Sequence, residues 1–318
     1  MFRALTAHNG IATHLSDLAA AENALKDEKN RVWLDFENPK KDELEYLEKK
    51  LDLHPLILED ISNQRQRTKV EPYENCIFLV VLVSDPASKS RQTNQVNFIL
   101  GPNFLVTVRN SPLPILDEVW QRVERNPALL TRGTDFTLYN LLDILVDSFF
   151  PILNEFDQDI DRVEERVFQD PSPKVLSELI GLKRKLFAFR KTITPLRDAL
   201  VVLARHDTTL ISKRNSPYFR DVYDHTVRIT ESLDNAREIV SAAMEGYLSS
   251  ISNNLNAIMK KLTAITAIVM IPTFIAGIYG MNFSDISEYA FGGAKAAFFL
   301  MGGSVLLLGG YFRMRGWL

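Results

Sequence analysis

Polar and sulfur-containing side chains recur at regular spacing in the last third of this chain. Their intervals of three and four residues are those of a heptad repeat, so parallel copies of one helix could supercoil with these side chains facing a common axis. This heptad stripe consists of Asn256, Met259, Thr263, Thr266, Met270, Thr273, Gly277 and Gly280. Polar groups within a membrane span usually face a bundle interior or water. The stripe therefore predicts a pore. Close helix packing through small residues is the alternative, and it accounts for the glycines better than for the amide, thioether and hydroxyl side chains.

The run that carries the stripe ends in an uncharged mouth, Gly280-Met281-Asn282, within the sequence IYGMNF (Ile278–Phe283). The stripe has no carboxylate that could hold a bare divalent ion, and Mg²⁺ loses its water reluctantly. A ring of Asn282 amide oxygens could accept hydrogen bonds from the waters of a hydrated cation and still release it. We therefore predict a selectivity filter at Gly280, Met281 and Asn282. Met270 is predicted to form an apolar gate, and Leu262 is placed among the pore-lining residues.

Two apolar segments are long enough to cross a membrane. Leu262–Asn282 contains no charged residue, and a shorter segment spans residues 296–312. Lys260 and Lys261 precede the first segment, and Arg313 and Arg315 follow the second. The positive-inside rule then predicts a multi-pass protein of the cell (inner or plasma) membrane with both termini in the cytoplasm. A buried core helix is the weaker alternative, since two such segments follow one another.

Composition restricts the remaining classes of function. The chain has 318 residues, a formal net charge of −3 and one cysteine, Cys76. The charge gives no reason to expect nucleic acid as a partner, and one cysteine excludes an internal disulfide or a multi-cysteine metal site. The N-terminus has no apolar core of signal-peptide length. We find no glycine-rich phosphate loop and no Ser/His/Asp arrangement at familiar spacing, so we expect neither an enzyme nor an organic cofactor. The five histidines are scattered, and we expect each to be a surface or core residue.

The patterning of residues 1–130 predicts an α/β domain. Strands are expected at Arg31–Asn38 and Cys76–Asp85, and a hairpin is expected around Gly101–Asn103. Helices are expected at Lys41–Leu51 and Leu113–Asn126. The predicted fold is thus a cytoplasmic α/β domain followed by long helices and two C-terminal transmembrane helices.

Long helices fill the rest of the sequence. One is predicted from an N-cap at Thr134 to just before Pro171, and a second follows it, with Pro195 as a candidate kink. A third runs from Ser216 to Tyr279 and would be about 96 Å long, with about 30 Å of it in the bilayer and the rest forming a stalk. The acidic positions between 155 and 165 either attract cations or form a solvated helix face. The predicted parts are an α/β domain (1–130), long helices (131–215), a stalk continuing into the first span (216–282), an outer loop (283–295), a second span (296–312) and a basic tail (313–318).

The chain resembles the CorA-type divalent-cation transporters. The segments that carry the resemblance are YGMNF (Tyr279–Phe283), PYFRDVYDHT (Pro217–Thr226), YLSSISNN (Tyr247–Asn254) and TFIAGIYGMNF (Thr273–Phe283). The resemblance covers essentially the whole chain, more weakly in residues 1–70. It implies a homopentamer with a funnel-shaped cytoplasmic domain whose stalk helix continues into the pore.

The resemblance also assigns residues. The pore-lining positions of the family match Asn256, Met259, Thr263, Met270, Thr273 and Asn282. Glu288 matches the glutamate of the outer loop, although Ile286-Ser287 replaces the usual Met-Pro, and Pro272 is displaced from the family's position. It further implies that Asp85 and Asp221 meet across a protomer interface and hold a regulatory Mg²⁺. The alternative is that Asp85 is a turn residue and Asp221 pairs with Arg220 or a neighbouring helix.

The leading hypothesis is a channel or transporter for hydrated Mg²⁺, and also for Co²⁺ and Ni²⁺, that moves the ion inward and is gated by cytoplasmic Mg²⁺. A zinc transporter of the same superfamily is a second hypothesis, which Met281 disfavours because those proteins tend to carry Gly-Ile-Asn. A membrane-anchored sensor without flux is a third.

Overall fold

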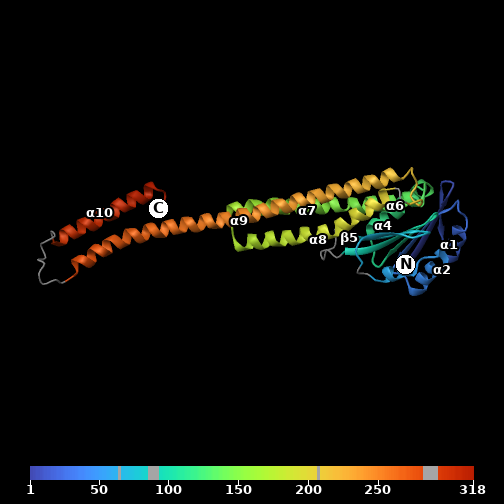
Figure 1. The fold of residues 1–318 in the computed structure, drawn as a ribbon, viewed down its shortest axis with the longest axis horizontal. Coiled ribbons are helices and arrows are strands. Elements are labelled where there is room, and N and C mark those ends of the chain that lie inside the picture. Colours follow the sequence, from blue (N-terminus) through green and yellow to red (C-terminus); the bar gives the residue numbers. More distant parts are fainter. Residues whose placement is uncertain (64–65, 85–92, 206–207, 282–292) are drawn as a thin grey trace. The chain divides into compact units, whose positions relative to one another are not determined.

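The fold is seen in a computed structural model that describes residues 1–63, 66–84, 93–205, 208–281 and 293–318 (Figure 1). The chain divides into two compact units. The first comprises Met1–Val163 and Glu178–Ser241, and the second comprises Glu164–Ser177 and Ala242–Leu318.

The first unit contains a seven-stranded sheet in the order β2-β1-β3-β7-β6-β5-β4. Its strands are β1 (Phe2–His8), β2 (Ile11–Leu15), β3 (Arg31–Glu37), β4 (Lys69–Pro72), β5 (Ile77–Ser84), β6 (Thr93–Leu100) and β7 (Phe104–Arg109). Only the pair β3–β7 is parallel, with Val32 opposite Phe104, and the other neighbours are antiparallel. The predicted strands at 31–38 and 76–85 and the hairpin around Gly101–Asn103 are confirmed as β3, β5 and β6–β7.

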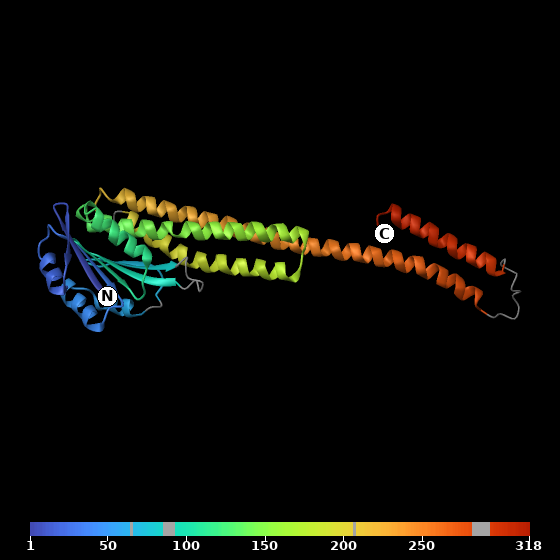
Figure 2. The ribbon, with the colours of Figure 1, turned by 180° about the vertical axis from the view of Figure 1, so that it is seen from behind.

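Helices cover both faces of this sheet (Figures 1 and 2). One face is covered by the helices α1 (Leu18–Leu25), α2 (Lys41–Leu51) and α3 (Pro55–Ser62). Val32 and Val106 of the sheet share one core there with Ala21 of α1, Leu47 of α2 and Ile57 of α3. The opposite face is covered by α4 (Pro114–Arg125), α5 (Ala128–Thr131) and α6 (Thr134–Asp147). There Trp33 meets Trp120 with ring centroids 4.8 Å apart. The alternation of side chains along a strand supplies one apolar set to each face.

An ionic network lies under α4 at the end of the two parallel strands. Arg109 is 2% exposed, and its Nη2 lies 3.3 Å from Asp35, 3.1 Å from Glu37 and 3.2 Å from Asp117. Arg3 Nη2 reaches the same Asp117 at 2.6 Å. Buried charges of this kind need partners, so the network ties β1, β3, β7 and α4 together.

Two predictions about the next helices are wrong. Residues 134–169 form two helices, α6 and α7 (Phe149–Gln169), that are separated at Ser148. Pro151 explains the break, because its ring nitrogen carries no hydrogen and cannot donate to the Asp147 carbonyl. Proline is tolerated, however, in the first turn of a new helix. Thr134 is not the N-cap. Gly133 takes that place, and the Thr134 hydroxyl donates to the Gly101 carbonyl at 3.3 Å.

The remaining helices follow the prediction closely. α8 (Pro173–Ala204) continues through Pro195, and α9 is a single helix from Ser216 to Tyr279. In the first unit, Phe156 of α7 packs on Phe189 of α8, and Arg190 of α8 pairs with Asp234 of α9. α10 (Gly293–Met314) contains the predicted segment 296–312.

Candidate functional site

The heptad stripe lies on α9 and on the turn that follows it. Its members from Asn256 to Gly277 are within the helix, and Gly280 and Met281 come directly after Tyr279. Each of these residues is exposed in the single chain, as is Leu262. The Thr273 hydroxyl donates to the Val269 carbonyl at 2.8 Å, so this hydroxyl is partly satisfied within its own helix. Asn282, Glu288 and Asp85 lie outside the described residues.

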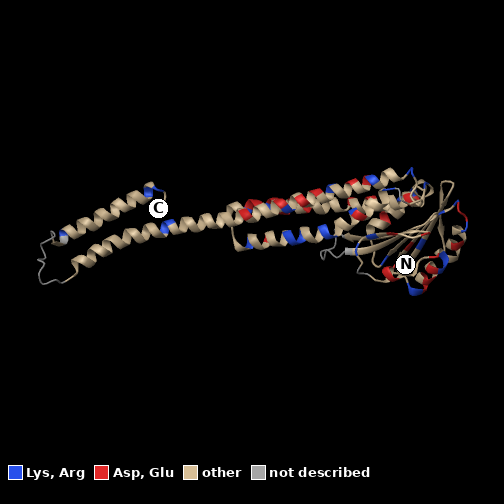
Figure 3. Ribbon diagram, viewed as in Figure 1, with Lys and Arg blue, Asp and Glu red and all other residues tan. Residues whose placement is uncertain are grey.

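The apolar side chains around the stripe are exposed as well. Only 6% of the most apolar 18-residue window of α9 is buried, and the corresponding share for Lys295–Met314 of α10 is 11%. Figure 3 shows this part of α9 free of charged residues. A helix that is apolar on all sides requires lipid or other helices around it. A third candidate by length and composition, Thr134–Gln169, differs because 56% of its window is buried within the fold.

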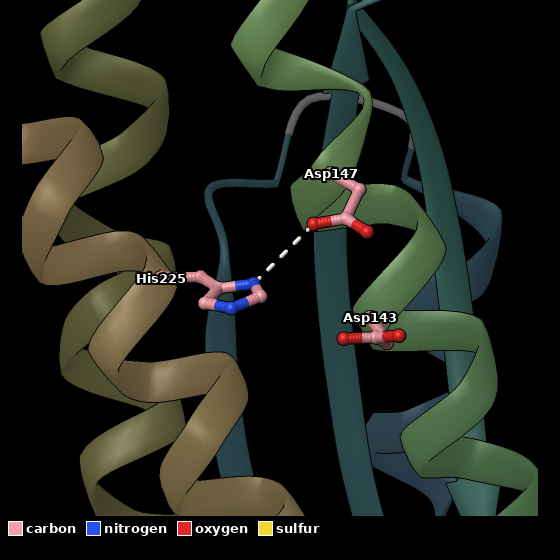
Figure 4. A group of neighbouring side chains, drawn as sticks. All are labelled: Asp143, Asp147 and His225. Atoms are coloured by element: carbon pink, nitrogen blue, oxygen red, sulfur yellow. Dashed lines mark ion pairs between the residues drawn. The ribbon is translucent and has the colours of Figure 1, made fainter.

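A second candidate site lies where α6 and α9 meet in the first unit. Asp143 and Asp147 are one turn apart on α6, and His225 faces them from α9 (Figure 4). One ligand atom from each lies within 4.8 Å of the other two. Asp147 Oδ1 is 3.3 Å from His225 Nδ1, and Asp221 Oδ2 is 3.9 Å from His225 Nε2. The contact to Asp147 lacks hydrogen-bond geometry, so the buried Nδ1 atom has no hydrogen-bond partner among the residues that the structure describes. We call Asp143, Asp147, Asp221 and His225 the α6–α9 acidic group.

The electrostatics of this group favour a cation. Burial raises the pKa of Asp143, and the charges of Asp147 and Asp221 raise it further, while His225 opposes them. The neighbouring Tyr139 has its pKa raised to about 12, by burial first and then by Asp143 and Asp221. Burial is the larger cause of both pKa shifts, and the neighbouring carboxylates add to it, so a bound cation would balance part of this negative charge.

The donor set of the group has a definite preference. Mg²⁺ takes oxygen ligands in octahedral geometry and keeps several waters, which suits one or two carboxylates. The imidazole adds a nitrogen donor that suits Co²⁺ and Ni²⁺. The residues therefore fit a partly hydrated Mg²⁺ on the carboxylates, and they fit a transition-metal ion with His225 included. Sequence reasoning placed Asp221 in a regulatory site but missed Asp143, Asp147 and His225. The available signal was an acidic pair at spacing four on α6, opposite an Asp–His pair at spacing four on α9.

A buried clamp holds the start of α9 against the start of α6. Asp135 Oδ2 accepts from the Ser212 backbone N–H at 2.9 Å and from its hydroxyl at 2.8 Å. Asp135 Oδ1 accepts from the Asn215 side chain at 3.0 Å. Arg132 donates to Asn215 at 3.1 Å, and its guanidinium carbon lies 4.7 Å from the centre of the Tyr218 ring. The clamp fixes the separation of the two helices that carry the acidic group.

The chain is similar in sequence to known metal-ion transport proteins. The sequence model of a family described as CorA-like Mg2+ transporter protein matches residues 28–314. The chain is 40% identical over 270 residues to a cobalt/magnesium transport protein CorA of Thermotoga maritima, covering 84% of this chain and 77% of that protein. It is 30% identical over 286 residues to the putative metal ion transporter YfjQ of Bacillus subtilis, covering 90% of this chain and 89% of that protein.

Solved structures show the same fold. The complete structure of the CorA magnesium transporter from Methanocaldococcus jannaschii matches with a TM-score of 0.83 at 24% identity, covering 100% of this chain and 99% of that chain. The full-length CmaX protein matches with a TM-score of 0.76 at 18% identity, covering 98% of this chain and 96% of that chain. The predicted α/β domain followed by long helices is thus confirmed.

Proposed function

This chain belongs to the CorA-like Mg²⁺ transporter family, whose members are transporters and not enzymes, and from that premise we propose that it conducts hydrated Mg²⁺ through a pore lined by α9. Co²⁺ and Ni²⁺ are proposed to pass by the same route, and the Thermotoga relative is named as a transport protein for cobalt as well as magnesium. The proposed pore is formed at the axis of a homopentamer, the assembly that the sequence resemblance implies.

The observation that carries the proposal is the heptad stripe on an exposed helix. A continuous α9 presents Asn256, Met259, Thr263, Thr266, Met270 and Thr273 along its length, followed by Gly277 and Gly280. These side chains offer neutral oxygen and sulfur groups, which bind a hydrated divalent ion weakly enough to release it. Asn282 supplies the amide ring of the outer mouth in this proposal, Met270 the apolar gate, and Glu288 attracts cations to the mouth.

We further propose that α9 and α10 cross the cell membrane with both termini in the cytoplasm. Their exposed apolar windows and the flanking cations support this placement. A potential that is negative inside would then drive the ion inward. Two charges across 100 mV correspond to about 4.6 kcal/mol, so such a pore must be able to close.

Closure is proposed to depend on cytoplasmic Mg²⁺ held by the carboxylates of the α6–α9 acidic group, together with Asp85. Mg²⁺ would balance the repulsion between Asp143, Asp147 and Asp221, and so favour the arrangement of α6 and α9 in which these carboxylates lie close together. Loss of the ion would leave the repulsion in place and release the stalk.

The proposed mouth is tested by Asn282→Ala in liposomes loaded with a Mg²⁺-sensitive dye. This variant should lose Mg²⁺ uptake and retain its oligomeric size, because it removes a ring of water-accepting oxygens and no core side chain. Asn254→Ala is the matched control, since Asn254 is an exposed amide on α9 but off the stripe. Wild-type uptake by Asn282→Ala would exclude Asn282 from the filter.

In the same assay, Met270→Ala should raise the basal leak, and an unchanged leak would place the gate elsewhere.

A further inference from the structure

The C-terminal end of α10 is closed by a Schellman turn. Gly316 has a φ of 68°, in the left-handed region that glycine adopts without steric cost. The Trp317 N–H donates to the Phe312 carbonyl at 2.9 Å, and the Gly316 N–H donates to the Arg313 carbonyl at 3.1 Å. These two bonds define the motif. The backbone of the helix end is therefore fixed, and so are the positions from which its side chains project.

Aromatic rings gather at this end. Trp317 stacks on Phe312 with ring centroids 5.4 Å apart and an interplanar angle of 23°. Phe312 is buried by its neighbours, while Tyr311 is 52% exposed. Tyr and Trp combine an apolar ring with a polar group, and they concentrate at the level of lipid headgroups. The Schellman turn folds Trp317 back toward the apolar helix instead of letting it extend away from the helix.

Two arginines project from the same turn. Arg313 and Arg315 are exposed, and the Arg315 guanidinium carbon lies 5.6 Å from the centre of the Tyr311 ring. The sequence has no Asp or Glu between Gly293 and Leu318. Within the part of the chain that the structure describes, neither arginine has a carboxylate at ion-pair distance. The result is two positive charges in the last turn, with Arg315 beside the exposed Tyr311 ring, at the opposite end of α10 from Lys295 (Figure 3).

We propose that Tyr311, Arg313, Arg315 and Trp317 form a binding site for the headgroup of an anionic phospholipid. This inference rests on the membrane placement of α10 in the proposed function. Each guanidinium group can bind the oxygens of a phosphodiester through a fork of parallel donors. Arg315 would do so beside the Tyr311 ring, and Arg313 from another side of the same helix end. The rings of Tyr311 and Trp317 lie along the glycerol and upper acyl region. A zwitterionic phospholipid offers the same phosphate but carries a cation that the arginines repel.

The helix dipole is a competing reason for cations at this position, because Arg side chains in a last turn stabilise a helix without any ligand. A site that binds free inorganic phosphate is a second competing explanation for these cations. The three explanations differ in what they predict for lipid preference.

The test is native mass spectrometry of the full-length protein in neutral detergent, titrated with phosphatidylglycerol and with phosphatidylcholine of the same acyl chains. Each arginine near an anionic surface favours binding about fivefold. The wild type should therefore prefer phosphatidylglycerol by about 25-fold, and Arg313→Gln/Arg315→Gln should lose this preference. Arg313→Lys/Arg315→Lys keeps the charges and should keep most of the preference. Lys295→Gln, at the other end of α10, is the control and should behave as wild type.

Equal affinity of the wild type for the two lipids would overturn the inference, and so would an undiminished preference in the double glutamine variant. Displacement of phosphatidylglycerol by millimolar inorganic phosphate would also overturn it, because the site would then recognise a free anion. Lipid binding is measured here without ion flux. A wild type that prefers phosphatidylglycerol but carries no Mg²⁺ would therefore contradict the proposed function alone. A wild type that conducts Mg²⁺ without lipid preference would contradict only this inference.

Discussion

At the scale of single residues, Asp135 determines how the long helix begins. Its carboxylate accepts from Ser212 and Asn215 in the loop that precedes α9, although the residue itself is the second of α6. Gly133 makes room for it, because a Cβ atom there would lie 2.2 Å from Asp135 Oδ1. The φ of 151° at Gly133 is also unfavourable for any other residue. Gly133 and Asp135 therefore depend on each other, and neither residue can be replaced freely.

We expect Asp135→Ala to lower the free energy of unfolding by about 3 kcal/mol, because it leaves several buried donors without an acceptor. Asp161→Ala is the matched control, since Asp161 is an exposed carboxylate on α7, and it should change stability by no more than about 0.5 kcal/mol. Thermal or chemical unfolding of the purified chain measures both. Equal effects of the two substitutions would show that the clamp does not stabilise the fold.

Sequence reasoning could not have found this clamp. Thr134 resembles an N-cap because it precedes an apolar run, and only the tertiary contact to Gly101 reveals where its hydroxyl goes. The α6–α9 acidic group was missed for a similar reason. The sequence gives only the spacing of four between Asp221 and His225, and this pair becomes a candidate ligand set only when α6 places two carboxylates opposite it. The spacing of residues along one helix does not show which residues of another helix will lie beside them.

At the scale of elements, the long α9 was predictable because its sequence contains nothing that stops a helix before Gly246. The break between α6 and α7 was missed although Pro151 signals it. The hairpin β1–β2 is absent from the predicted elements, even though Asn9-Gly10 is a strong turn signal. Both residues have positive φ, 50° and 81°, as a two-residue hairpin loop of this kind requires.

Gly246 is a weak point in the part of α9 that precedes the predicted membrane span, because glycine has a low helix propensity. In the second unit, a Cβ atom at this position would lie 3.4 Å from the nearest atom of the Phe168 ring, which is ordinary van der Waals contact. Gly246→Ala should therefore fit without displacing Phe168 and should stabilise the helix by about 1 kcal/mol. A rise in the midpoint of thermal unfolding would confirm this. Ala242→Gly, one turn earlier on the same helix, should lower the midpoint by a similar amount. A lower midpoint for Gly246→Ala would mean that the contact with Phe168 is tighter than its geometry indicates.

At the scale of the whole molecule, the proposal joins a cation-sensing group on two helices to a pore on one of them. We expect millimolar Mg²⁺ to protect α9 of the wild type from proteolysis, because an ion bound only by the closed arrangement stabilises it by about 2.7 kcal/mol at 100 times its dissociation constant. Mg²⁺ should protect two variants less than the wild type, the double variant Asp143→Asn/Asp147→Asn and the single variant Asp221→Ala. Asp161→Asn, outside the group, should be protected as well as wild type. Equal protection of all four proteins would remove the α6–α9 acidic group from regulation.

The central claim is that this chain itself moves Mg²⁺, and uptake into liposomes tests it most directly. Purified protein is reconstituted, a potential negative inside is imposed with a potassium gradient and valinomycin, and internal Mg²⁺ is followed with a dye. The account predicts uptake that depends on the potential and is blocked by external cobalt hexammine, a trivalent complex that has about the size of hydrated Mg²⁺ and does not shed its ligands. Folded, reconstituted protein that takes up no more Mg²⁺ than empty liposomes would contradict the account.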